Sequence, residues 1–366
     1  GGQTGKSIGN KRKYRQKTEQ RKGWKNKKEV LQSMKKSACF CVSLILLLCS
    51  ACGNTETSIT TIEENQENSQ ASEEALSIQN MEVIPQDKLI YSNLDSEASM
   101  TEVRDTLIKA GIGTNHIDIV LNWVTDYNNS MRECPSFTLA GDFISADKML
   151  VDYGEYPPMS TQWYKRNNRN YHDVVCRIVA YELNRDNISV GEVIKEENFD
   201  CWDENTAWLY TDGDILFGRE AVEGEHKAYV PFPLIDWSKD TQAEYFTLFN
   251  PISVAEQCSE QEMFDAIQKK WNEQEILFKE DAFSLITFWT QSGNRICASH
   301  AATLLEIDNG EYLLFEKTNP ESPYAASRFS SIDKVKQYLY NMMNLDYSRY
   351  NDKIGTYIIL QNNKLF

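Results

Sequence analysis

The sequence has only four histidines, and the five cysteines that follow residue 53 include no pair with zinc-finger spacing. It has no internal repeat. Its apolar run over residues 38–48 is far shorter than the roughly 20 residues that a membrane-spanning helix needs. These absences exclude a zinc module, a repeat array and a chain held in the membrane by a spanning helix. We therefore expect no metal and no cofactor.

The short apolar run is arranged like a secretory signal. Two lysines precede it, and small residues lead into Cys52, which predicts a signal peptide over residues 34–51. The ending Leu-x-Ser-Ala-Cys-Gly resembles the lipobox of bacterial lipoproteins, which implies that Cys52 receives a diacylglycerol and becomes the new N-terminus. An ordinary signal peptide is the alternative. We expect a lipid-anchored protein on the extracytoplasmic face of the cell membrane.

The segments on either side of the signal differ in charge. Residues 1–33 are strongly basic without apolar periodicity. Because Met34 resembles a natural start, we expect them to be an upstream extension that is not native. Residues 52–86 are acidic, and residues 54–76 carry no aromatic side chain. Such a segment cannot bury enough surface to order itself, so we expect a disordered tether.

The chain after the signal is strongly acidic. Residues 1–51 contain thirteen Lys or Arg and two acidic residues, which leaves 25 basic and 52 acidic residues of the totals of 38 and 54, a net charge of −27. Because this part of the chain is so acidic, its overall negative potential is not expected to attract nucleic acid or an anionic lipid surface. The membrane contact is therefore assigned to the lipid on Cys52.

Residues 87–366 are rich in aromatic and branched side chains and predict one globular α+β domain, expected to be monomeric. Four helices are predicted in this domain. Their signals are capping boxes at Ser99 and Ser259, an apolar stripe over residues 114–131, and a helix start at Ser331. Strands are predicted over residues 283–289, 301–307, 312–316 and 356–360. The Asp-Asn-Gly sequence at 308–310 predicts a hairpin between the middle two. Helices are thus expected to pack on an antiparallel sheet in the C-terminal part.

Cys176 has the sequence context of a nucleophile. Asp173 is a candidate N-cap, and apolar residues continue a helix through Leu183. A thiol at a helix N-terminus feels the positive end of the helix dipole, which favours the nucleophilic thiolate. The alternative is a small buried residue on a core helix. Disulfides are the default outside the cell, but five cysteines leave at least one thiol free.

His300 is the candidate general base, because it leads into the strand over residues 301–307. Glu316, on the returning strand, is its candidate orienting acceptor. A hairpin symmetric about residue 308 pairs His300 with Glu316. A minimal two-residue turn instead pairs it with Asn319 and turns Glu316 to the other face. The arrangement therefore requires a four- or five-residue loop or a bulge, and Asn319 is the alternative acceptor.

The other candidates have weaker support from the sequence. Asn170, six residues before Cys176, is a candidate oxyanion-hole amide. His116, His172 and His226 are better explained by core, local or solvent-exposed roles.

The chain resembles papain-like cysteine hydrolases in the order of three features. A cysteine opens a helix, a later histidine leads into an antiparallel sheet, and a polar acceptor follows one strand further on. That superfamily includes cell-wall peptidases. The resemblance implies a papain-like fold with Cys176 as nucleophile, His300 as general base and acid, and Glu316 as orienter. Papain-type enzymes usually place glutamine where Asn170 stands here.

The chain also resembles an uncharacterised Gram-positive lipoprotein family known as domain of unknown function 4300. This resemblance implies a fold and a location but no chemistry. The matching features are Tyr91–Leu94, Cys176-Arg177 at a helix start, His300 before a hydrophobic hairpin, Phe315–Lys317, Ser322–Phe329 and Gln361–Phe366.

Two functions from different classes follow from these observations. The first is an extracytoplasmic cysteine hydrolase of amide or isopeptide bonds, with cell-wall peptide as a candidate substrate. The second is a binding or scaffolding lipoprotein without turnover; a glycosidase using acidic pairs such as Asp203 and Glu204 is weaker. A Cys176 sulfur next to His300 and opening on a cleft favours the enzyme. Burial of Cys176, or a disulfide from it to Cys134, Cys201, Cys258 or Cys297, is expected to remove the enzyme hypothesis.

Overall fold

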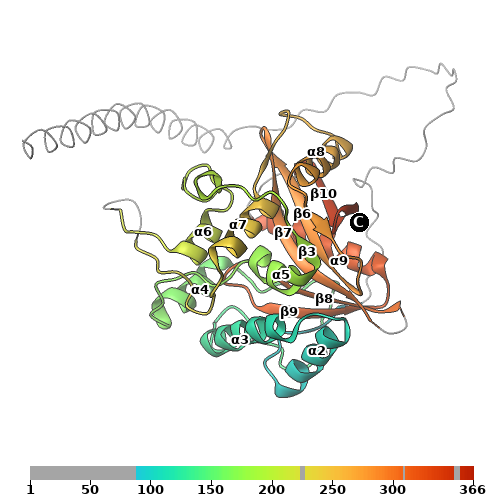
Figure 1. Cartoon of the computed structure of the whole chain (residues 1–366). Helices are drawn as coiled ribbons and strands as arrows, with labels where there is room; N and C mark the ends of the chain where they lie inside the picture. Colours follow the sequence, from blue (N-terminus) through green and yellow to red (C-terminus); the bar gives the residue numbers. More distant parts are fainter. Residues whose placement is uncertain (1–87, 223–226, 308–309, 350–354) are drawn as a thin grey trace, which may run out of the picture. The chain divides into compact units, whose positions relative to one another are not determined.

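The computed structural model describes residues 88–222, 227–307, 310–349 and 355–366, and all statements below concern these residues. They form a mixed α/β arrangement around a nine-stranded antiparallel sheet (Figure 1). β4 (Ile252–Ser253) pairs with the first residues of β7. The other strands lie in the spatial order β11 (Lys364–Leu365), β10 (Tyr357–Gln361), β6 (Phe283–Ser292), β7 (Arg295–Glu306), β8 (Tyr312–Lys317), β9 (Tyr324–Phe329), β1 (Ile90–Ser92) and β2 (Ile144–Ser145).

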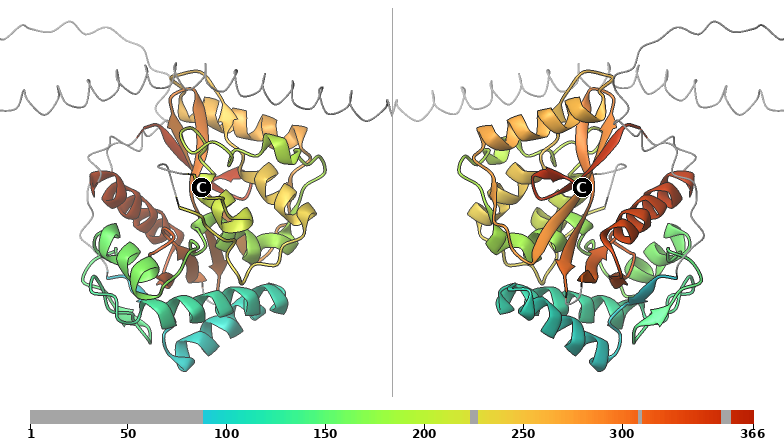
Figure 2. Two further views of the ribbon diagram at one scale, coloured as in Figure 1. Left: turned by 90° about the vertical axis from the view of Figure 1, so that its left-hand side faces the viewer. Right: turned by 90° about the vertical axis from the view of Figure 1, so that its right-hand side faces the viewer.

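Helices cover both faces of this sheet. α9 (Ile332–Arg349) lies on the side opposite to α7 (Lys239–Phe249) and α8 (Glu260–Glu273) (Figure 2). The remaining elements are α2 (Glu97–Lys109), α3 (Thr114–Met131), α4 (Tyr156–Ser160), the π-helix η2 (Thr161–Arg166), α5 (Cys176–Asn184), α6 (Tyr210–Phe217), the 3₁₀ turns η3 (Arg185–Asn187) and η4 (Glu196–Asn198), and the pair β3 (Ile188–Ser189) and β5 (Leu277–Phe278).

The alternation of side chains along β8 separates the two cores. Leu313 and Phe315 belong to the larger apolar cluster, which contains α3 and α5, whereas Leu314 belongs to the smaller cluster under α9. Because successive side chains of a strand point to opposite faces of the sheet, Glu316 points toward α9 and Lys317 points toward α5. The two neighbouring side chains act on opposite faces of the sheet.

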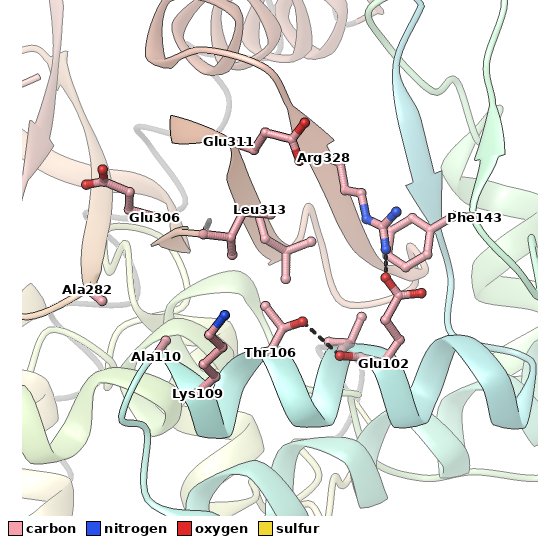
Figure 3. Close-up of a pocket in the computed structure, with 12 residues that line it drawn as sticks. Glu102, Thr106, Lys109, Ala110, Phe143, Ala282, Glu306, Glu311, Leu313 and Arg328 are labelled. Carbon is pink, nitrogen blue, oxygen red and sulfur yellow. Dashed lines mark hydrogen bonds and ion pairs between the residues drawn. The ribbon is translucent and has the colours of Figure 1, made fainter. Parts of the chain in front are cut away.

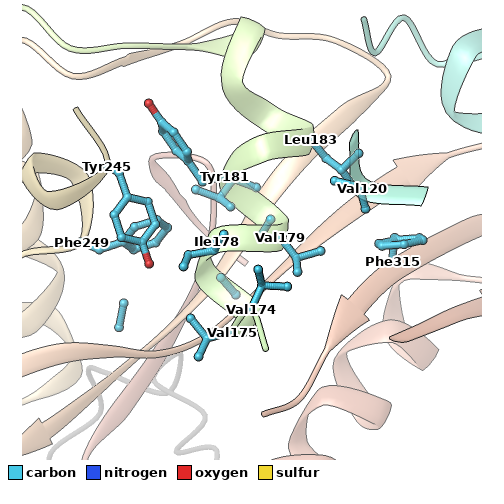
Figure 4. Packing of buried hydrophobic residues seen from close by; sticks show 14 of the residues in the cluster. Val120, Val174, Val175, Ile178, Val179, Tyr181, Leu183, Tyr245, Phe249 and Phe315 are labelled. Carbon is cyan, nitrogen blue, oxygen red and sulfur yellow. The ribbon is translucent and has the colours of Figure 1, made fainter. Parts of the chain in front are cut away.

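α5 lies at the centre of the larger core. All nine of its residues are buried, and its three polar side chains are paired: Arg177 with Asp212, Glu182 with His116 and Asn184 with Thr303. Val179 and Ile178 pack among residues from α3, α7 and β8, including Val120, Tyr245 and Phe315 (Figure 4). This packing holds the body of α5 against the sheet.

The helices predicted over 114–131 and from Ser259 and Ser331, and the four predicted strands, are all present. α8 begins with the predicted capping box. The box at Ser99 is wrong, because Ser96 is the N-cap of α2 and its hydroxyl accepts from the Ser99 N–H. The expectation of helices first and sheet later holds only in part: β1 and β2 come from the N-terminal part, and α9 follows β9.

Several expectations lie outside the described residues. They are the upstream extension, the signal peptide, Cys52 and its tether, His226, and residues 308 and 309 of the hairpin turn. In the part of the chain that is described, no helix combines the length and apolar character needed to cross a membrane.

A buried histidine–carboxylate pair connects α3 to α5. His116 Nδ1 lies 2.7 Å from Glu182 Oε1, and Trp237 Nε1 donates to the other carboxylate oxygen. The hydrogen bond with Glu182 raises the pKa of His116, and the charges of Glu182 and Asp186 add to it, against the opposing effect of burial. His116 therefore binds a proton more tightly in the folded chain than in the unfolded chain.

This pair predicts a pH-dependent stability. A raised folded-state pKa stabilises the fold fully below the unfolded pKa of about 6.5, and the contribution is lost as pH rises through the folded-state value. We expect His116→Gln to lower the free energy of unfolding more at about pH 5.5 than at about pH 8.5. Urea unfolding at both pH values measures this, and an equal loss at the two contradicts it.

Candidate active site

Cys176 is the first residue of α5, as the sequence suggested, but Asp173 is not its N-cap. The N-cap position is occupied by Val175, without a side-chain cap. Cys176 is a free thiol, like Cys134, Cys201, Cys258 and Cys297, so the expected default of disulfides is not found among these five.

The start of α5 meets the sheet where β8 has ended. The last pair between β7 and β8 is Ala302–Glu316, so β7 continues past the end of β8. There the side chain of His300 and the backbone N–H of Ala301 act to lower the pKa of the Cys176 thiol. A β-bulge at Ser299, just before His300, breaks the pairing of β6 with β7. Bulges re-aim side chains, and this one precedes the candidate base.

Glu316 contacts His300 from the neighbouring strand. His300 Nε2 lies 2.8 Å from Glu316 Oε2. The Tyr338 hydroxyl of α9 donates to Glu316 Oε1. Both carboxylate oxygens are therefore occupied, and Glu316 fixes the orientation of the ring.

The register that produces this contact differs from both predicted registers. β7 and β8 are symmetric about residue 309, with Glu306 paired to Tyr312 across a five-residue connection. Glu316 is thus diagonal to His300 on the same face rather than directly opposite. Asn319 is not the acceptor, because its side-chain oxygen accepts from the Ser322 N–H.

The electrostatics favour a thiolate–imidazolium pair. Burial acts to raise the pKa of the Cys176 thiol, but the hydrogen bond from His300 and the charges of Arg177 and His300 outweigh it and hold the pKa below its ordinary value. Burial acts to lower the pKa of His300, yet its hydrogen bonds with Cys176 and Glu316 raise that pKa well above the usual value. Both shifts favour the charged pair near neutral pH.

Arg177 supplies a fixed positive charge beside the thiol. It is buried, and its Nε donates to Asp212 Oδ1 at 3.0 Å while Nη1 donates to the Ala298 carbonyl at 2.9 Å. The Tyr245 hydroxyl also donates to Asp212. The guanidinium therefore connects the start of α5 to β7 and α6.

The remaining sequence candidates lie elsewhere or in other roles. The side chain of Asn170 is exposed, and its backbone carbonyl accepts from the Val230 N–H. Among the described contacts none joins Asn170 to Cys176. His172 bonds to the Tyr164 hydroxyl and stacks on Tyr229, and Asp203 and Glu204 are exposed.

The site is closed in this conformation. Cys176 and His300 are only 4% and 3% exposed. A cavity of about 600 Å³ lies elsewhere, between α2 and the β7, β8 and β9 strands, lined by residues that include Lys109, Glu311 and Arg328 (Figure 3). No Cys176, His300 or Glu316 atom lines it. Within the described ranges, no group of three or more His, Cys, Asp or Glu side chains could hold a metal ion.

Comparison with known proteins identifies the family. Residues 90–366 match the domain of unknown function DUF4300. The chain belongs to this family. No curated protein and no solved structure matches it.

The DUF4300 match covers the whole described part from β1 onward, so the cysteine–histidine–glutamate arrangement lies within the family domain. Sequence reasoning missed three of its supports: Tyr338, the Arg177–Asp212 pair and the Asp173–Lys317 pair. Each joins segments distant in sequence, and a polar residue inside an apolar stretch was the only signal for it.

Proposed function

We propose that this DUF4300 protein is a lipid-anchored, extracytoplasmic cysteine hydrolase of amide or isopeptide bonds, with cell-wall peptide as the candidate substrate. The observation that carries the proposal is the free thiol of Cys176 at the start of α5, whose pKa is lowered by His300, while His300 is itself hydrogen-bonded to Glu316. Its chain order resembles that of papain-like hydrolases. The lipobox-like sequence before Gly53 supports the location.

In the proposed reaction the Cys176 thiolate acts first and the His300 imidazolium acts second. The Cys176 thiolate attacks the amide carbonyl carbon, and a C–S bond forms. His300 then gives its proton to the departing amine as the C–N bond breaks. Neutral His300 takes a proton from water, whose oxygen attacks the thioester, releasing the carboxylic acid and restoring the thiolate. Glu316 keeps the ring oriented and favours its protonated form.

The start of α5 supplies donors for the developing oxyanion. The first backbone bond of this helix runs from the Val179 N–H to the Val175 carbonyl. The N–H groups of Cys176 and Arg177 therefore precede the intrahelical ladder, at the positive end of the dipole. This assignment replaces Asn170 in the oxyanion role.

Release of amines from cell-wall peptide tests the proposal. We expect the full chain, incubated with isolated cross-linked peptide, to release free amines measured with an amine-reactive fluorophore. Cys176→Ser lowers the rate by about 10³-fold or more, because a poorer nucleophile replaces the thiolate. Equal release by the wild type and Cys176→Ser contradicts the proposal.

Cys176 is buried, which is the outcome that the sequence analysis set against an enzyme, and this favours the second candidate function, a binding lipoprotein without turnover. At 4% exposure the sulfur meets a substrate carbonyl only after neighbouring residues move. Binding of the same peptide without any amine release, by wild type and Cys176→Ser alike, supports this second function.

A further inference from the structure

A buried ion pair joins the strand that carries Glu316 to the segment that carries Cys176. Lys317 Nζ lies 2.9 Å from Asp173 Oδ2, and both side chains are fully buried. Lys317 follows Glu316 on β8 and points to the opposite face, while Asp173 lies three residues before Cys176. Glu316 therefore orients His300, and the adjacent residue Lys317 contacts the segment that leads into Cys176.

Lys317 contacts several elements at once. Its Nζ donates to the Ser322 carbonyl at 2.6 Å and lies over the rings of Tyr127 and Tyr324, 3.9 and 4.3 Å from their centroids. The Tyr127 hydroxyl in turn donates to the Glu321 carbonyl. The ammonium thus connects α3, the β8–β9 connection and the residues before α5.

Such a pair is costly, which suggests a purpose beyond stability. Burial raises the pKa of Asp173 to about 6 despite the charge of Lys317, and burial lowers the pKa of Lys317 despite the charge of Asp173. Well-packed apolar residues often replace a buried ion pair without loss of stability, so stability alone does not require one.

We propose that Asp173 and Lys317 are positioning residues that hold Cys176 within hydrogen-bond reach of His300. The inference rests on the proposed function, because it concerns the same site. The charges of the pair oppose each other, so its effect on Cys176 comes mainly through position. Once the pair is lost, the Val175–Cys176 segment is free to move away from His300 and the thiol loses the hydrogen bond that stabilises its thiolate.

A double variant separates positioning from stability. Asp173→Asn with Lys317→Met keeps the side-chain sizes and leaves no buried charge unpaired. We expect urea unfolding of the full chain close to wild type, but alkylation of Cys176 by iodoacetamide at about pH 6.5 at least tenfold slower, which requires the thiol pKa to rise by more than about one unit. A wild-type pH profile in the double variant overturns the inference.

Two further variants complete the design. If the double variant does not fold, Lys317→Met alone carries the same expectation and the same contradicting result, because the raised pKa of Asp173, about 6, lets its carboxyl become neutral without the lysine. The exposed pair Arg132–Asp95, 2.7 Å apart, is the control, and Arg132→Met with Asp95→Asn leaves the profile unchanged. An ordinary thiol profile in the wild type instead overturns the proposed function and this inference together. A low-pH profile that survives in the double variant overturns this inference alone.

Discussion

His300→Ala is expected to slow alkylation of Cys176 by about 100-fold at about pH 6.5, because a thiol with an ordinary pKa near 8.5 is only about 1% thiolate at that pH. The hydrogen bond from His300 is the main influence that opposes burial of Cys176. Without it, burial returns the thiol to its neutral form. Iodoacetamide labelling with mass-spectrometric mapping of Cys176 measures the rate across pH.

His172→Ala is the matched control, since His172 lies four residues before Cys176 and contacts Tyr164 and Tyr229. It should leave the labelling profile at the wild-type position. Equal slowing by both alanine variants means that loosening the fold, rather than losing the base, controls the thiol.

Cys52→Ser is expected to move the protein from the membrane and detergent-rich fraction to the aqueous fraction almost completely. The proposed anchor is a diacylglycerol on the Cys52 thiol, and serine lacks the sulfur that accepts it. A lipid with two acyl chains anchors a protein stably, whereas a single chain binds only marginally. Detergent phase partition after expression in a lipoprotein-processing host measures the change.

Cys49→Ser is the control, because it removes a cysteine from the same signal without touching the lipidated position. It leaves the protein in the detergent phase. If Cys52→Ser also stays there, the lipidation proposal is wrong, and an ordinary signal peptide or another anchor takes its place.

Local signals predicted much of the fold. The stripe over residues 114–131 matches the bounds of α3, and the Ser259 capping box opens α8. The strands of the C-terminal part were recognisable because their apolar runs are long. Short elements such as β1, β2 and β4 were missed, since two or three residues carry no period and are ordered only by their partners.

The candidate site was predictable in its members but not in its geometry. Cys176 and His300 stood out by residue type at element boundaries, and Glu316 by its place on the returning strand. The register was wrong because the Asp-Asn-Gly turn allows several loop lengths, and each sets a different pairing. The bulge at Ser299 and the pair Asp173–Lys317 depend on tertiary contacts, which one sequence does not encode locally.

The protonation state of Cys176 is the central claim, and ultraviolet difference absorbance tests it without requiring a reagent to enter the closed site. The thiolate absorbance of the wild-type chain is measured against Cys176→Ala across pH. We predict a difference of one thiolate that is present at about pH 6.5 and disappears only on acidification, as expected for a thiolate paired with imidazolium. A difference that appears only above about pH 8.5, the ordinary thiol value, contradicts the account.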